Sequence, residues 1–238
     1  MAIKSITEKD CIHVELLDKI DLRKIVNSGQ VFRASFEASS NGEYQFYCRD
    51  KKVSVHQVSE SCLDFYCSME DFRDVWMFYF DLIDDYNEIF KSWEVSHTDD
   101  YFRRSMEFGS GMRILRQDLW ETIISFMISQ NNNIPRIANT INSMCIDGKF
   151  PTPEFLANSD LSGYHLGYRE PWIKDFASIC FKDPGILSYP VTHCGYDNTM
   201  NWLKSFKGIG DKVANCICLY SLHYMDAFPI DTWMRKIS

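Results

Sequence analysis

Residues 203–231 read LKSFKGIGDKVANCICLYSLHYMDAFPID, and this stretch decides more about the fold than any other. Two glycines, Gly208 and Gly210, stand one residue apart between two patterns of apolar residues at helical spacing. The pattern predicts a hairpin that opens a helix and gathers backbone N–H groups at the positive end of the helix dipole. We therefore expect a seat for one phosphate. Its main-chain donors are expected at Gly208, Ile209, Gly210 and Val213.

Two charged side chains accompany this hairpin. Lys212 follows the second glycine by two residues, and Asp231 begins another helical pattern. The positive end of a helix dipole disfavours an ammonium, and an uncharged amine is what nucleophilic attack requires. The competing explanations are a solvated surface charge for Lys212 and a simple helix N-cap for Asp231.

Composition indicates a globular protein with an ample core, because 45% of its 238 residues are hydrophobic. No run approaches the roughly 18–20 apolar residues of a membrane span. The first residues, MAIKSITEKD, lack the apolar stretch of a secretory signal. The nine cysteines show no paired metal-site spacing, so we expect free thiols in a reducing cytosol and no metal.

The net charge of −8 argues at first sight against a nucleic-acid partner. Residues 1–105, however, hold 20 of the 33 acidic residues and 13 of the 25 basic ones. Residues 106–238 are therefore close to neutral. Helix ends and a few arginines can hold phosphates without a basic domain, although such binding should weaken readily with salt.

The hydrophobic pattern changes along the chain from strand-like to helical. Alternating residues predict strands near 12–16, 44–48, 53–58 and 63–65, with a hairpin turn at Asn41-Gly42 and one short helix over 21–27. From Glu70 onward the spacing is helical. We expect an α+β fold, with an antiparallel β-sheet domain over residues 1–105 and an all-helical domain over residues 106–238.

Within the helical half, a helix should begin at Asp118, which precedes Glu121 at capping-box spacing. It should end at the three asparagines of residues 131–133. Asparagine tolerates the left-handed conformation, so an exposed, tightly folded corner is expected there. Pro135 suits the first turn of the next helix.

Six short words occur in order along the chain: GQVFR at 29–33, RILRQD at 113–118, SQNNNIPRI at 129–137, GYR at 167–169, the hairpin through Lys212, and PID at 229–231. In these words the chain resembles the 8-oxoguanine DNA glycosylase family of helix-hairpin-helix DNA glycosylases. The resemblance implies a TATA-binding-protein-like N-terminal domain and a DNA-binding cleft where the two domains meet.

The resemblance also implies roles for the two charged residues. Lys212 corresponds to the amine that attacks C1′ and releases the base, and the resulting Schiff base permits strand cleavage by β-elimination. Asp231 corresponds to the carboxylate that stabilises the positive charge developing on the sugar. No cofactor is implied.

Four further residues are similar to those that handle the opened duplex. Asn131 resembles the residue that fills the gap left by the extruded base. Arg136 and Arg169 resemble the pair that reads the widowed cytosine, with Tyr168 wedged beside them, because an arginine fork can meet the two acceptors on that base edge. The competing explanation is that both arginines are surface charges.

Three residues are implied to contact the damaged base. Gly29 resembles the residue whose carbonyl accepts the N7 proton of 8-oxoguanine, and Cys216 resembles the thiol that stacks on one face of the base. A helix stop and a core cysteine are the competing explanations. Relatives continue beyond residue 238 with a helix whose aromatic covers the other face, so we expect a truncated C-terminal end. Two explanations stay open: the given chain is incomplete, or another group, Tyr220, compensates for the missing aromatic.

The sequence thus predicts a bifunctional enzyme that removes 8-oxoguanine opposite cytosine from double-stranded DNA and has AP-lyase activity. We expect a monomer that does not associate with membranes and is cytoplasmic, nucleoid-associated in a bacterium or nuclear in a eukaryote. Two alternatives stay open: a truncated helix-hairpin-helix protein that binds DNA without cutting it, and a glycosylase for other damaged bases. Lys212 argues against the alkylated-base enzymes, which lack the hairpin lysine.

Overall fold

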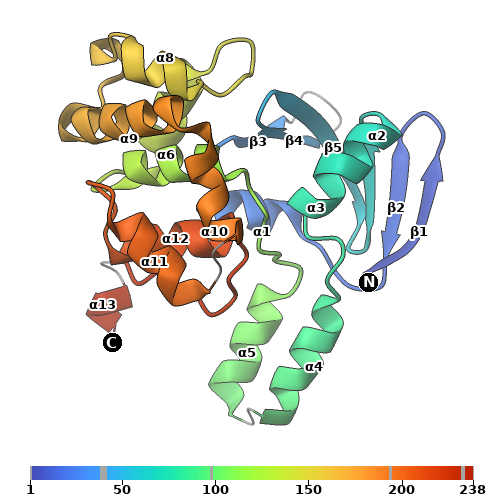
Figure 1. Cartoon of the computed structure of the whole chain (residues 1–238). Coiled ribbons are helices and arrows are strands. Elements are labelled where there is room, and N and C mark those ends of the chain that lie inside the picture. The colour runs from blue at the N-terminus through green and yellow to red at the C-terminus, as the bar shows by residue number, and fades with distance from the viewer. Residues whose placement is uncertain (1, 38–41, 97–98, 193–194, 232–233, 238) are drawn as a thin grey trace. The chain divides into compact units, whose positions relative to one another are not determined.

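The computed structural model describes residues 2–37, 42–96, 99–192, 195–231 and 234–237 (Figure 1). The chain forms two compact units, one of residues 1–47 and 52–116 and one of residues 48–51 and 117–238. The division expected after residue 105 falls inside helix α5 (Asp100–Gly109), which belongs to the first unit.

The first unit contains a six-stranded sheet in the order β1-β2-β6-β5-β4-β3. Its strands are β1 (Ile3–Glu8), β2 (Ile12–Leu16), β3 (Ala34–Glu37), β4 (Glu43–Cys48), β5 (Lys51–Ser59) and β6 (Cys62–Tyr66). The antiparallel sheet and the α+β fold are confirmed. β1 and β3 were not foreseen, because β1 buries little and β3 is short. The turn expected at Asn41-Gly42 lies partly outside the described residues.

One face of this sheet is covered by aromatic side chains. Alternate strand residues such as Val55 and Phe65 are fully buried. The Phe65 ring lies 5.1 Å from that of Phe72 and 5.4 Å from that of Phe80. The elements α2 (Met69–Asp71), η1 (Phe72–Trp76) and α3 (Met77–Tyr79) form one continuous helical segment. Phe72 begins η1, and Phe80 is the C-cap residue that directly follows α3. The middle part of this segment is a π-helix, which the sequence pattern did not reveal.

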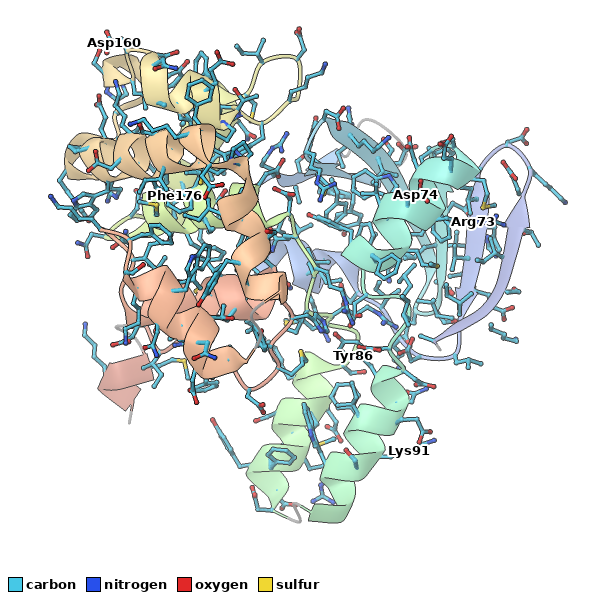
Figure 2. All side chains as sticks on the ribbon, in the orientation of Figure 1. Arg73, Asp74, Tyr86, Lys91, Asp160 and Phe176 are labelled. Atoms are coloured by element: carbon cyan, nitrogen blue, oxygen red, sulfur yellow. The ribbon has the colours of Figure 1, made fainter. Side chains whose placement is uncertain are left out.

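Arg113, the first residue of the word RILRQD, is a buried charged residue of the first unit. Arg113 is fully buried; it pairs with the Asp18 carboxylate and donates to the Asp81 carbonyl at 2.7 Å. Its guanidinium also lies 4.7 Å from the ring centre of Tyr86, at the start of α4 (Tyr86–Ser96) (Figure 2). The buried side chain of Gln30 bonds the carbonyl of Arg113 and the amide of Leu115. The terminal guanidinium nitrogens of Arg113 and the Gln30 amide are thus buried with partners, as burial requires, whereas the buried Nε of Arg113 has no hydrogen-bond partner.

The second unit is helical. Its elements are α6 (Leu119–Ser129), α7 (Ile134–Met144), α8 (Pro153–Asn158), η2 (Ser162–Tyr164), η3 (Gly167–Arg169), α9 (Glu170–Lys182), η4 (Pro184–Ser188), α10 (Tyr189–Thr192), α11 (Tyr196–Lys204), α12 (Asp211–Tyr220) and α13 (Met234–Ile237). Phe176 of α9 stacks on Trp120 of α6 with ring centres 5.9 Å apart (Figure 2). None of the helices in the described part of the chain is long and apolar enough to cross a membrane.

Local sequence signals place the starts of several helices. The short helix α1 (Leu22–Asn27) of the first unit begins behind Asp21, which accepts from the amide of Lys24. In the second unit Asp118 accepts from the amide of Glu121 at 3.1 Å, so the cap expected for α6 is confirmed. Pro135 stands in the first turn of α7, and Asn131 has φ +46°, as expected of the corner between the helices.

Candidate nucleic-acid interface and active site

The twin-glycine hairpin joins α11 to α12, as its spacing predicted. Gly208 has φ +89°, which other residues rarely adopt. A Cβ on Gly208 would also lie 2.6 Å from Cε3 of Trp172, so the indole packs directly against the bare backbone. An ion pair of 2.6 Å between Lys204 and Asp211 joins the end of α11 to the start of α12. The conformation of the hairpin is therefore fixed by the packing of Trp172 on Gly208 and by the Lys204–Asp211 ion pair.

The start of α12 is open. Its N-cap residue, Gly210, makes no side-chain cap bond, whereas α6 and α7 are capped by Asp118 and Asn133. A Cβ on Gly210 would meet nothing within 4 Å. The first-turn amides, including that of Val213, therefore face a position that an anion can approach. The amide of Ile209 is different, because it already donates to the Phe206 carbonyl at 3.1 Å inside the hairpin.

Lys212, Cys216 and Asp231 form one electrostatic group. Cys216, one helical turn after Lys212, is 2% exposed. Burial raises the pKa of its thiol, while the charge of Lys212 and a hydrogen bond from it lower the pKa and the charge of Asp231 raises it. The two charged residues singled out in the sequence therefore act in opposite directions on the pKa of one buried thiol.

The segment after α12 folds back along that helix and carries Asp231 with it. The Asn215 side-chain oxygen accepts from the Tyr196 hydroxyl at 2.7 Å and from the Phe228 amide at 3.0 Å. Three residues later the Asp231 carboxylate accepts from the Met234 amide at 2.8 Å. The N-cap role considered for Asp231 is therefore real, and it fixes the carboxylate at the start of α13.

The asparagine corner is held by the GYR word. The Asn131 side chain donates to the Tyr168 hydroxyl at 3.1 Å. Arg169, 8% exposed, donates to the carbonyls of Gln130, Asn131 and Leu166, and its guanidinium lies 4.5 Å from the Tyr168 ring centre. The structure therefore brings Asn131, Tyr168 and Arg169 together. Arg169 is not a surface charge, because it is buried and its donors are bonded to main-chain carbonyls.

Arg136 differs from Arg169 in its surroundings. It lies in the first turn of α7, and its side chain is exposed. Its backbone amide donates to the Asn133 cap at 3.0 Å. The side chain is therefore placed by a capped helix start but can reach a ligand from there.

An aromatic pair lies beside the lysine. The Lys212 Nζ is 5.3 Å from the ring centre of Phe126, which stacks on Tyr220 with ring centres 5.6 Å apart and planes 20° apart. Burial raises the pKa of Tyr220 to about 12. Part of the Tyr220 ring is thus already occupied by its stacking contact with Phe126.

Gly29 belongs to the first unit. It follows α1 with φ +80°, in the left-handed region, and Gln30 beside it is buried. The helix-stop explanation therefore holds for Gly29, and a role toward a base does not conflict with it. The carbonyl of a left-handed glycine is directed by backbone geometry that a side chain would strain.

Three residues of this site were missed in the sequence: Phe126, Gln130 and Asn215. Phe126 is one of several apolar residues on α6, and nothing distinguishes it from core. Gln130 directly precedes the asparagines, and its side chain donates to the Gly208 carbonyl at 2.9 Å. Asn215 is a polar residue within the amphipathic α12, and that position was the one available signal.

A family model matches residues 14–123, and its description is 8-oxoguanine DNA glycosylase, N-terminal domain. A Saccharomyces cerevisiae N-glycosylase/DNA lyase is 35% identical over 54% of this chain and 41% of its own length. A probable N-glycosylase/DNA lyase of Methanothermobacter thermautotrophicus is 28% identical over 56% of this chain and 53% of its own. The matched regions thus span about half the length of these curated relatives.

The fold is similar to that of solved structures over nearly the whole chain. The Clostridium acetobutylicum 8-oxoguanine glycosylase/lyase, solved with double-stranded DNA containing cytosine opposite 8-oxoguanine, has a TM-score of 0.88 and 33% identity. The match covers 99% of this chain and 85% of that one.

Proposed function

Since the chain belongs to the 8-oxoguanine DNA glycosylase family, we propose that it excises 8-oxoguanine opposite cytosine from double-stranded DNA and then cleaves the strand as an AP lyase. The observation that carries the proposal is the position of Lys212. Its amine stands in the first turn of a helix without a side-chain cap, 5.3 Å from the ring centre of Phe126, and its charge lowers the pKa of the Cys216 thiol, which the charge of Asp231 raises.

The reaction begins with the unprotonated amine of Lys212. Its lone pair forms a bond to C1′ while the C1′–N9 bond breaks, and the bonding electron pair leaves with the base, which is then protonated. Positive charge develops on the sugar during this step. The Asp231 carboxylate, fixed by its bond to the Met234 amide, stabilises that charge more than it stabilises the neutral substrate.

The lyase step uses the same covalent bond. Opening of the sugar ring converts the adduct at C1′ to a Schiff base with Lys212. Loss of a proton from C2′ then expels the 3′ phosphate, and hydrolysis frees the lysine. These steps use groups of the chain and water, so we expect no cofactor.

Phosphate binding is supported by the open start of α12. The amide of Val213 and the bare backbone at Gly208 and Gly210 are the proposed contacts. Ile209 would contribute by its place in the turn, because its own N–H is bonded to Phe206. One such seat would set the DNA backbone beside Lys212.

Recognition of the opposite cytosine is assigned to the asparagine corner. We propose that Asn131 fills the gap in the duplex, with Tyr168 wedged next to it. Exposed Arg136 can reach a base edge directly. Arg169 would read the cytosine only by exchanging some of its carbonyl partners, so its donors have to be redirected when DNA binds.

Recognition of the damaged base is assigned to Gly29, Cys216 and Tyr220. The Gly29 carbonyl would accept the N7 proton that guanine lacks. Cys216 offers a small buried thiol to one face of the base. Tyr220 stacks on Phe126, so the part of its ring not used there would meet the base.

The partner is duplex DNA, bound by a monomer. The net charge of −8 predicts modest affinity that falls with rising salt. Because its proposed substrate is DNA, we expect the protein to be located at the nucleoid of a bacterium or in the nucleus of a eukaryote.

Borohydride trapping tests the proposal. Duplex containing 8-oxoguanine opposite cytosine should form a covalent adduct with the wild-type chain when the Schiff base is reduced. Lys212→Gln should bind the same duplex without forming an adduct. Excision that persists in Lys212→Gln would refute the nucleophile, binding without any product would indicate a DNA-binding module, and adducts only with other lesions would indicate a different substrate.

A further inference from the structure

The Lys212 amine lies over an aromatic ring that no feature of the sequence singled out. Its Nζ is 5.3 Å from the ring centre of Phe126. Phe126 is 2% exposed and comes from the middle of α6, a helix whose residues 121–128 are all buried. A ring held on all sides in this way has a fixed position.

The ring and its neighbour form a neutral surface under the amine. Phe126 stacks on Tyr220 at 5.6 Å, and burial raises the pKa of the Tyr220 phenol to about 12, so it stays uncharged at neutral pH. Two polar groups lie outside this aromatic pair: the Cys216 thiol, one turn after Lys212 on α12, and the Asp231 carboxylate beyond the end of α12. The charges of Lys212 and Asp231 act in opposite directions on the pKa of the Cys216 thiol. The amine therefore lies next to an aromatic face, and its charge also lowers the pKa of the Cys216 thiol.

An aromatic face attracts the hydrogens of an ammonium or an amine through its negative quadrupole. An amine whose N–H groups are drawn to the ring directs its lone pair away from the ring. Nucleophilic attack needs that lone pair aligned with the reacting carbon, and small errors of alignment cost much rate.

We propose that Phe126 is a positioning residue that orients the Lys212 amine for attack on C1′. This rests on the proposed function, since it assigns a partner to the same nucleophile. The ring acts through the lysine and need not touch the DNA. Its electrostatic face, and not its bulk alone, carries the effect.

Fluorination of the ring separates these two contributions. Incorporation of 3,4,5-trifluorophenylalanine at position 126 keeps the ring nearly the same shape but weakens its negative face. At saturating duplex and on the plateau of the pH–rate profile, we expect borohydride trapping to slow about threefold with the trifluoro ring and about tenfold with Phe126→Leu. The Kd for the duplex should stay within about twofold in both, because the ring takes no part in DNA binding.

A matched control accounts for lost packing. Phe72→Leu removes another fully buried ring, in the first unit, and should lower the melting temperature without slowing trapping. If the trifluoro ring traps at the wild-type rate, or if Phe72→Leu slows trapping as much as Phe126→Leu, the proposal is overturned. The same series includes wild type and Lys212→Gln. If wild type forms no adduct, or if Lys212→Gln still forms one, the proposed function itself fails, and this outcome is distinct from failure of the Phe126 proposal.

Discussion

The side-chain amide of Gln130 donates a hydrogen bond of 2.9 Å to the carbonyl of Gly208. The main-chain carbonyl of the same Gln130 accepts from Arg169 at 2.9 Å. Gln130 therefore connects two proposed DNA-binding features. One is the hairpin that is proposed to bind a phosphate, and the other is the asparagine corner, whose Asn131 is proposed to fill the gap left by the extruded base.

Gln130→Glu should separate the hairpin from the corner. The change preserves shape but replaces the donor with a carboxylate that faces the Gly208 carbonyl, so we expect a loss of about 1–2 kcal/mol in the free energy of unfolding. Affinity for duplex DNA should fall as well, because the hairpin loses an anchor. Urea unfolding and fluorescence anisotropy measure the two effects. An unchanged DNA affinity would show that the hairpin keeps its shape without this bond.

The two hairpin glycines should respond differently to alanine. At Gly208 the new methyl would meet Trp172 at 2.6 Å in a backbone conformation of φ +89°, so Gly208→Ala should destabilise the protein by about 1–3 kcal/mol. At Gly210 the methyl meets nothing within 4 Å, so Gly210→Ala should melt like wild type. It should nevertheless bind DNA more weakly, because the methyl stands where the phosphate is proposed to approach. Equal DNA affinity of Gly210→Ala and wild type would contradict the phosphate seat.

Substitution of Arg169 should lower stability, whereas substitution of Arg136 should lower selectivity for the opposite base. Arg169→Ala removes a buried guanidinium from three carbonyls, so we expect a loss of about 2–3 kcal/mol in the free energy of unfolding. Exposed Arg136→Ala should unfold like wild type but lose preference for cytosine opposite the lesion. Excision rates with each of the four opposite bases measure that preference. A variant of Arg136 that keeps full cytosine preference would exclude it from base reading.

Alkaline pH should destabilise the second unit through buried thiols. Burial raises the pKa of Cys180 and of Cys218 from 9.0 to about 12. Between these values the unfolded chain releases protons that the folded chain retains, so the free energy of unfolding falls as pH rises. The fall is about 1.4 kcal/mol per pH unit for each thiol. Urea unfolding between pH 8 and 10.5 should show Cys218→Ala with a shallower slope than wild type, and parallel slopes would refute this assignment.

The strands that the sequence predicted are those with alternating burial. β2 alternates buried and partly exposed residues, and its signal was clear. β1 pairs with β2 at the sheet edge but is mostly exposed, so its residues carry little hydrophobic pattern. The π-helix in η1 escaped detection because apolar spacing does not distinguish one wider turn from α-helix.

The sequence by itself determined the features that depend on neighbouring residues: the Asp118 cap, the left-handed Asn131 corner and the glycine hairpin before Lys212. These are local, because a cap or a turn is specified by backbone conformation and side chains a few residues apart. Only the tertiary structure decided that Phe126 lies under Lys212 and that Gln130 holds Gly208, 78 residues away. Helical periodicity tells which face of a helix is buried but not what it is buried against, since that depends on how the helices pack.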